Sequence, residues 1–186
     1  ARSADCILAL DPVSVGFPAM LAAKLMRKRF FVKIVGDYAW EQHMQKIQNF
    51  VAPDEFQRRR YDLATEVRRG VEHWVARSAD RVIVPSEYLK KIVALWLVPR
   101  ERITVVYNAF EPPASAETRE EIRAHLELPY PTLVSVGRLE PWKGFGALID
   151  VMPEIVERYP SARLYIIGDG PERRNLETRE HVVFLG

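Results

Sequence analysis

The sequence predicts an α/β fold with two units, each built around a parallel sheet. Three observations support this prediction. Short apolar segments alternate with amphipathic segments along the 186 residues, as parallel strands and their connecting helices do. Two of the apolar segments end at a glycine and lead into a helical pattern. Residues 112–131 have the composition of a linker, with prolines at both ends, and place a boundary between the two units.

Seven short apolar segments are expected to form the strands, namely residues 6–10, 31–35, 81–84, 103–106, 132–136, 163–167 and 182–185. Helical patterns lie between them, in residues 17–29, within 53–79, and in 87–97, 116–126, 145–159 and 171–179. Ser86 is a good N-cap for the third of these helices, and Pro160 follows the end of the fifth. Because the strands are continuous apolar runs, we expect helices to cover both faces of each sheet.

The composition is that of a folded globular protein. Hydrophobic residues make up 48% and charged residues 28% of the chain, which excludes a disordered one. No segment reaches the roughly 18 consecutive apolar residues of a membrane span, and the first residues show no signal-peptide pattern. Cys6 is the only cysteine, so an intramolecular disulfide is excluded. We therefore expect a cytoplasmic protein.

The net charge of +2 conceals an uneven distribution. Residues 1–112 hold 18 lysines and arginines against 13 aspartates and glutamates, and residues 113–186 hold 9 against 12. The basic excess is concentrated in residues 24–29 and 58–69. These groups are explained either by solvated helix faces or by a surface for an anionic lipid or a phosphate-bearing acceptor. The second explanation implies peripheral contact with the inner face of an anionic membrane.

The loop after the expected strand 132–136 is the strongest candidate for a binding site. The strand ends at Gly137, the loop carries Arg138 and Lys143, and a helical pattern begins at residue 145. Backbone N–H groups at such a turn attract an anion, and the two cations can neutralise the charge of a phosphate. The alternative is an ordinary strand-to-helix connection with two solvated cations.

Two other segments stand at the carboxyl ends of expected strands, where ligands commonly bind in parallel sheets. Gly168 and Asp169 begin a glycine turn after strand 163–167, and Pro171 suits the first turn of the next helix. A simple tight turn would explain them equally well. Asp37 follows strand 31–35, and its alternative role is to cap the following turn. The sequence leaves both pairs of explanations open.

The motifs VGRLEPWKGFGALID, LYIIGDGPERRNLE and HVVFLG together resemble the donor-binding half of glycosyltransferase family four, retaining enzymes of the GT-B fold. Upstream, ADRVIVPSEYLKK and ITVVYNAFE resemble the end of that family's first domain and its crossing to the second. The resemblance implies two Rossmann-like units of GT-B type. Residues 1–112 would be the rear part of an acceptor-side domain, and residues 113–186 the front part of a nucleotide-sugar donor-binding domain.

The resemblance also implies roles for the candidate residues. Arg138 and Lys143 would bind the diphosphate of a nucleotide-sugar donor and stabilise the departing nucleoside diphosphate. The nucleotide site would further include Gly137, Gly168 and Asp169. The reaction implied is transfer of a hexose to a glycan or lipid-linked acceptor, with no cofactor, no metal ion and no nucleic-acid partner.

Asp37 is a third catalytic candidate, because many relatives place a histidine about here, near the donor phosphate or the reacting sugar. The resemblance also implies further segments on both sides of this chain, among them an acidic E-x7-E segment after residue 186. We therefore expect both units to be incomplete, the isolated chain to be inactive, and exposed sheet edges to favour a homo-oligomer. The alternatives are a non-catalytic nucleotide- or phosphate-binding α/β module and a truncated unit without activity of its own.

Overall fold

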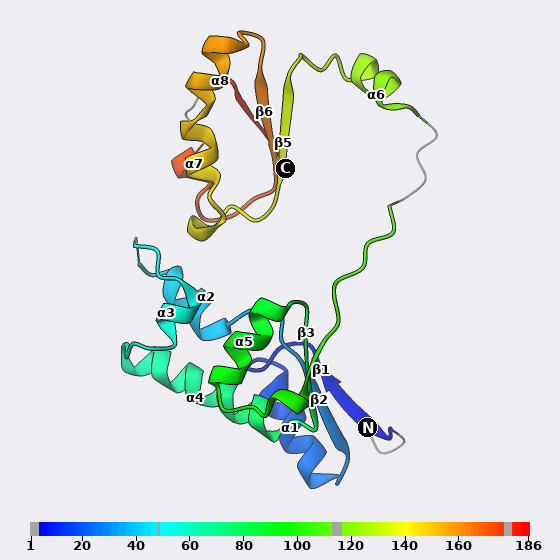
Figure 1. Ribbon diagram of the computed structural model, residues 1–186, viewed down its shortest axis with the longest axis vertical. Helices are drawn as coiled ribbons and strands as arrows, with labels where there is room; N and C mark the ends of the chain where they lie inside the picture. Colours follow the sequence, from blue (N-terminus) through cyan, green and yellow to red (C-terminus); the bar gives the residue numbers. More distant parts are fainter. Residues whose placement is uncertain (1–3, 48, 113–116, 177–179) are drawn as a thin grey trace. The chain divides into compact units, whose positions relative to one another are not determined.

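The computed structural model describes residues 4–47, 49–112, 117–176 and 180–186 (Figure 1). The chain divides into two compact units, Ala1–Phe110 and Glu111–Gly186. One contains a four-stranded sheet and the other a three-stranded sheet, and the strands of both pair in parallel. The predicted α/β class with parallel sheets is therefore confirmed.

The sheet of the first unit is assembled in sequence order. Its strands are β1 (Cys6–Ala9), β2 (Arg29–Lys33), β3 (Arg81–Val84) and β4 (Ile103–Val105), and each pairs with the next along the chain. Parallel connections nearly always have the same hand, so a sheet that grows in one direction receives its helices on one face. Figure 1 shows the helices of this unit gathered on one side of the strands.

Three helices build the core of the first unit: α1 (Gly16–Leu25), α4 (Leu63–Ser78) and α5 (Glu87–Leu95). Alternate strand residues are buried in this core, including Phe30 and Val32 of β2. Among the described residues, no comparable layer covers the opposite face, where Leu8 of β1 is 52% exposed. The expectation that helices cover both faces is wrong for this unit, because the strand order places the connections on one side.

The second unit repeats this arrangement on a smaller scale. Strands β5 (Thr132–Val136), β6 (Arg163–Ile167) and β7 (Val182–Leu185) pair in sequence order, and helices α7 (Phe145–Asp150) and α8 (Met152–Arg158) lie on one face (Figure 1). The core on that face includes Leu164 and Ile166 of β6 together with residues of both helices. The other face carries four apolar side chains that are 40–72% exposed: Val134, Val136, Ile167 and Leu185. The expectation of two covered faces is wrong here as well.

The remaining helices are α2 (Tyr38–Met44), α3 (Pro53–Phe56), α6 (Arg119–His125) and α9 (Arg173–Leu176), with short 3-10 turns at Arg100–Arg102 and Pro141–Lys143. Helix α2 was not predicted. The helix expected over residues 145–159 is two helices, because Pro153 has no N–H to donate to the turn before it. Of the helix expected over 171–179, residues 177–179 lie outside the described residues. No helix in the described ranges is long and apolar enough to cross a bilayer.

A stacked pair of rings connects α4 with the end of α5 and predicts that the stability of this unit depends on pH. His73 stacks on Trp96 with 5.1 Å between ring centroids. Burial, with a smaller contribution from the charges of Arg69 and Arg77, lowers the pKa of His73 from 6.5 to about 4. The unfolded chain therefore binds more protons than the folded one between these two values. The stability that the neutral ring contributes is fully present above pH 6.5 and is lost as the pH falls through 4.

We expect His73→Phe to remove this dependence while keeping a ring against Trp96. Between pH 7 and pH 4 the free energy of unfolding should fall by about 2–3 kcal/mol less in the variant than in the wild type. Urea unfolding followed by tryptophan fluorescence at both pH values measures the difference. Equal losses in the two proteins would contradict the assignment.

Candidate functional site

Two glycine turns of the second unit lie side by side at the carboxyl ends of β5 and β6. The first follows β5 and begins at Gly137, whose N–H donates to the carbonyl of Ile167 at 3.0 Å. The N–H of Leu139 donates to the carbonyl of Asp169 at 2.9 Å, and the N–H of Glu172 donates to the carbonyl of Leu139 at 3.1 Å. These backbone bonds make the two turns a single structural element, which we call the double turn.

The close approach of the two turns requires glycine at two positions. Gly168 has φ of +142°, and a Cβ there would lie 2.1 Å from the carbonyl oxygen of Gly137. A Cβ at Gly170 would lie 2.5 Å from the carbonyl oxygen of Leu139. Any side chain at either position would push the first turn away from the second. The glycines thus position the loop that carries the two candidate cations.

Arg138 and Lys143 are both exposed on this loop. The side chain of Arg138 is 70% exposed and forms an ion pair with Glu140, whose side chain is only 2% exposed. One carboxylate oxygen of Glu140, Oε2, is buried and has no hydrogen-bond partner among the described residues. Lys143 ends the 3-10 turn, which is closed by its own N–H donating to the carbonyl of Glu140 at 3.0 Å. An incoming phosphate would therefore meet Lys143 directly and would share Arg138 with Glu140.

Gly144 connects this loop to helix α7. It has φ of +76°, the left-handed conformation that glycine adopts at low cost, and its carbonyl accepts the N–H of Leu148 at 3.0 Å. Helix α7 then begins at Phe145, as the sequence predicted. The strand, loop and helix expected around the candidate site are all present.

A third cation, Arg173, lies beside the double turn and was not predicted from the sequence. Its Nη1 donates to the carbonyl of Gly168 at 3.4 Å and also to the carbonyl of Gly186. Its guanidinium lies over the ring of Phe184, 5.4 Å from the centroid. The signal for it in the sequence was its position three residues after Gly170.

Asp169 is exposed, and its Oδ1 accepts the N–H of Gly170 at 2.8 Å, so this residue has a structural role in the turn.

Asp37 belongs to the first unit and caps helix α2. Its Oδ1 accepts the N–H of Trp40 at 2.8 Å, and its Oδ2 accepts a hydrogen bond from Nε2 of Gln57 at 2.7 Å. The residue is 5% exposed. The cap that the sequence suggested as one explanation is therefore present. Both oxygens are already engaged, and a catalytic role for Asp37 stays a prediction.

A second buried carboxyl group, Glu72, lies beside Asp37 and was not predicted. Its Oε1 accepts the N–H of Tyr38 at 3.0 Å and its Oε2 accepts the N–H of Ala39 at 3.3 Å. Burial raises the pKa of Asp37. Burial, and then the negative charge of Asp37, raises the pKa of Glu72 well above its usual value. Glu72 therefore keeps its proton to a higher pH than an exposed glutamate does. Its hydrogen bonds fasten α2 to α4, and those of Asp37 fasten α2 to the end of α3.

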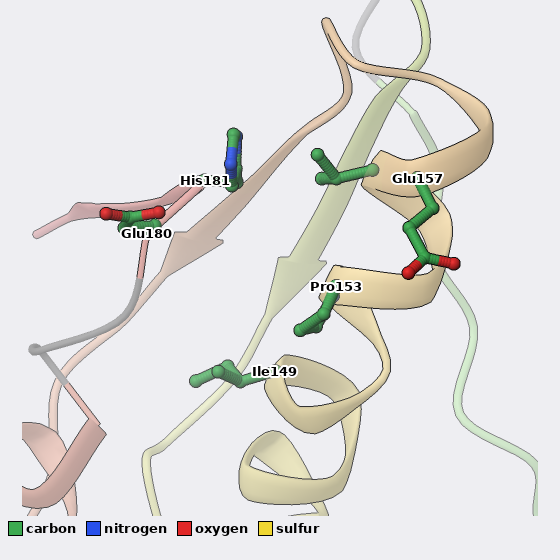
Figure 2. Close-up of a pocket in the computed structure, with 6 residues that line it drawn as sticks. Ile149, Pro153, Glu157, Glu180 and His181 are labelled. Carbon is green, nitrogen blue, oxygen red and sulfur yellow. The ribbon is translucent and has the colours of Figure 1, made fainter.

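A hollow of about 350 Å3 opens at the other end of the second sheet. Figure 2 shows Ile149, Pro153 and Glu157 on the side of helices α7 and α8, and Glu180 and His181 on the side of β7. Nδ1 of His181 is 2.8 Å from Nη1 of Arg163. His181 precedes β7, so this hollow lies at the amino end of that strand, whereas the double turn lies at the carboxyl ends of β5 and β6. Two carboxylates in its lining make it unsuited to a phosphate.

Metal ligands are not gathered anywhere in the described ranges: no group of three His, Cys, Asp or Glu side chains there could hold a metal ion. The chemistry that the described site offers is electrostatic. Exposed cations on a loop fixed by backbone hydrogen bonds can hold a multiply charged anion without reorganising the fold.

Comparison with known sequences matches both units to glycosyl transferase family models. Residues 1–109 match the family model described as glycosyl transferase 4-like domain, and residues 118–186 match the one described as glycosyl transferases group 1. An uncharacterized glycosyltransferase of Methanocaldococcus jannaschii is 33% identical over an aligned length of 121 residues, and the match covers 57% of this chain and 31% of that protein. The GDP-mannose-dependent alpha-(1-6)-phosphatidylinositol monomannoside mannosyltransferase of Mycobacterium tuberculosis is 35% identical over an aligned length of 83 residues, and the match covers 41% of this chain and 21% of that protein.

Among solved structures, the HepE protein of Anabaena in complex with UDP is similar over the whole chain. The TM-score is 0.68 at 20% identity, with 100% of this chain and 49% of HepE covered. A second structure of HepE contains UDP-glucose and has a TM-score of 0.64. The chain thus spans about half of HepE, and its matches span less than a third of the two curated relatives. The likeness to HepE is one of fold, and the GT-B-like fold predicted from the sequence is confirmed.

Proposed function

The chain belongs to the glycosyl transferase 4-like family, and from that premise we propose that it serves in the retaining transfer of a hexose from a nucleotide diphosphate sugar to an acceptor. Residues 1–112 would form part of the acceptor side, and residues 113–186 part of the donor side. The observation that carries the proposal is the double turn, which presents Arg138 and Lys143 from a loop held by backbone hydrogen bonds.

The chemistry explains why cations are needed there. When the bond between the sugar and the diphosphate breaks, negative charge accumulates on the departing phosphate. Cations fixed beforehand at that position stabilise the transition state more than the ground state, which lowers the barrier. Arg138 supplies a forked donor and Lys143 a mobile point charge. Gly137 and Gly168 keep the backbone close enough for the phosphates to approach the double turn.

For the donor we propose only its chemical class, a nucleotide diphosphate sugar, and not a particular nucleotide or sugar. HepE has been solved with UDP and with UDP-glucose, and the mycobacterial relative is described as GDP-mannose-dependent. Both types of donor share a diphosphate, which is the part that Arg138 and Lys143 would contact. Asp37 is retained as a catalytic candidate through its place at the carboxyl end of β2.

Calorimetric titration with UDP, GDP and uridine tests the donor site, and a transfer assay with UDP-glucose and GDP-mannose tests turnover. We expect this chain to bind at least one of the two diphosphates, to bind uridine much more weakly, and to transfer no sugar by itself. The reason is that the groups binding the sugar hydroxyls are proposed to lie outside these residues, and their loss costs several orders of magnitude in rate.

Failure to bind either diphosphate would overturn the proposed donor site. Turnover by this chain, abolished by Lys143→Ala, would overturn the proposal that further groups are required. The anomeric configuration of the product, determined by NMR on a form that does turn over, decides whether transfer is retaining. If the chain binds diphosphates but no form of the protein transfers a sugar, the non-catalytic binding module would be favoured.

We further propose a cytoplasmic protein that contacts an anionic membrane peripherally and uses a glycan or lipid-linked acceptor. Support comes from the end of α1, where Leu21, Lys24 and Leu25 are exposed. Apolar and basic side chains together suit the surface of an anionic bilayer.

The uncovered apolar face of the second sheet supports self-association, which light scattering in solution would detect as a mass above 21.5 kDa.

A further inference from the structure

A second concentration of positive charge lies in the first unit, where α3 joins α4. Three consecutive arginines occupy this connection, and helix α4 faces them. A hollow of about 370 Å3 opens here and is lined by Gln57, Arg58, Arg59, Arg60, Glu66, Arg69, Gly70 and His73. We call it the arginine pocket. It belongs to a different unit from the double turn and has no residue in common with it.

Arg69 fixes the shape of the arginine pocket from inside. Its side chain is 10% exposed, and Nη1 donates to the carbonyl of Arg59 and to Oε1 of Glu66, both at 2.9 Å. Nη2 donates to the carbonyls of Gln57 at 3.2 Å and Phe56 at 3.4 Å. One guanidinium thus binds three backbone carbonyls within residues 56–59, so this part of the connection is held in one conformation rather than left as a free loop.

The charges that remain on the outside are incompletely balanced. Arg59 is paired with Glu55, and Arg69 with Glu66. Arg58 and Arg60 are exposed, and within the described ranges neither forms an ion pair with another side chain. His73 adds no charge at neutral pH, because its pKa is lowered to about 4. Two unpaired cations beside a third in a fixed turn repel one another, and a bound anion would offset that repulsion.

The size and lining of the pocket indicate what kind of anion fits. Its volume lies at the lower end of the range for small-molecule sites, roughly 300–1,000 Å3. Its lining is mostly guanidinium, carboxylate, amide and imidazole, with no large apolar side chain. Guanidinium groups recognise phosphate oxygens through paired N–H donors. A compact phosphorylated group fits these properties better than an uncharged sugar or an apolar ligand does.

We propose that the arginine pocket is a binding site for a phosphate-bearing ligand, a phosphomonoester or a pyrophosphate, carried either by a soluble molecule or by the headgroup of an anionic lipid. Arg58 and Arg60 contact the phosphate oxygens. Arg59 contributes in competition with Glu55, and Arg69 is a positioning residue that holds the turn. The site is independent of the donor site proposed at Arg138 and Lys143.

The test separates the two sites by using the full chain with Arg138→Gln and Lys143→Gln as background. In this background, pyrophosphate and glycerol 3-phosphate are titrated calorimetrically, and phosphatidylcholine vesicles with and without phosphatidic acid are tested by co-sedimentation. Arg58→Gln/Arg60→Gln removes two exposed charges from the pocket. Arg68→Gln/Lys91→Gln removes the same charge outside the pocket and is the matched control.

We expect Arg58→Gln/Arg60→Gln to weaken binding by about tenfold or more, which corresponds to at least about 1.4 kcal/mol, and the control to change it by less than about twofold. UDP binding in the wild-type background should be unaffected by Arg58→Gln/Arg60→Gln, so failure here leaves the donor site untouched. Arginine-dependent binding of the free anions assigns a soluble ligand, and binding only to phosphatidic acid vesicles assigns a lipid headgroup. No binding of any probe, or equal losses in the two double variants, would overturn the proposal.

Discussion

Replacing Arg138 or Lys143 by alanine should weaken the binding of nucleoside diphosphates by about 1.5–3 kcal/mol for each residue, which is a factor of roughly 10 to 150. The reason is that each side chain is proposed to make a charge-assisted hydrogen bond to the diphosphate. Both side chains are exposed, but Arg138→Ala also removes the ion-pair partner of the buried Glu140, so circular dichroism is used to check that each variant is folded. The measurement is calorimetric titration of each variant with UDP and GDP.

Uridine provides the control ligand, and Arg158→Ala provides the control variant. Arg158 is an exposed cation of the same unit at the end of α8, which leads into the amino end of β6, whereas the double turn lies at the carboxyl ends of β5 and β6. Uridine lacks phosphates and should bind the two loop variants as it binds the wild type. Equal losses for UDP and uridine would mean that the loop acts only in folding. An equal effect of Arg158→Ala would mean that net charge alone attracts the ligand.

The strands and the order of the elements could be predicted because they depend on local pattern. Strands β3, β5, β6 and β7 begin and end at the residues expected from their apolar runs, and Ser86 caps α5 by accepting the N–H of Leu89 at 3.1 Å. Residues 29–35 illustrate a limit. The apolar run alone gave a strand over 31–35, whereas pairing with β1 extends β2 back to Arg29.

The number of covered faces could not be predicted, because it depends on strand order. An apolar run has the same appearance whether one or both sides of the strand are packed. The order β1-β2-β3-β4 emerges only when the strands pair, and it determines where the connecting helices lie. Helix α2 was missed for a related reason. Its start depends on Asp37 as a cap and on Glu72, which is 35 residues away in sequence and binds the N–H groups of Tyr38 and Ala39.

At the candidate site, sequence alone identified the cations and glycines but not their mutual arrangement. The role of Gly168 in backbone approach follows from its contact with Gly137, which lies 31 positions earlier. The burial of Glu140 beside Arg138 was also not apparent, because glutamates are usually exposed. The arginine pocket shows the same limit: the run of residues 58–60 was visible as charge, but the hydrogen bonds of Arg69 that fix it were not.

Gly168→Ala and Gly170→Ala should each destabilise the second unit by about 3 kcal/mol or more, because the added methyl group meets backbone rather than a movable side chain. The Cβ would lie 2.1 Å from the carbonyl oxygen of Gly137 in the first variant and 2.5 Å from that of Leu139 in the second. Hydrogen exchange of the amides in β5, β6 and β7 localises the effect to this unit.

Gly146→Ala is the matched control, since a Cβ there meets no atom closer than 4.0 Å and the residue lies within helix α7. That change should be neutral or stabilising by up to about 1 kcal/mol. Because Arg138 lies between Gly137 and Leu139, displacement of the first turn must also move the guanidinium. Loss of amide protection and loss of UDP affinity should therefore occur together in Gly168→Ala and Gly170→Ala. If either variant retained wild-type protection and affinity, the double turn would not be the element that positions the donor site.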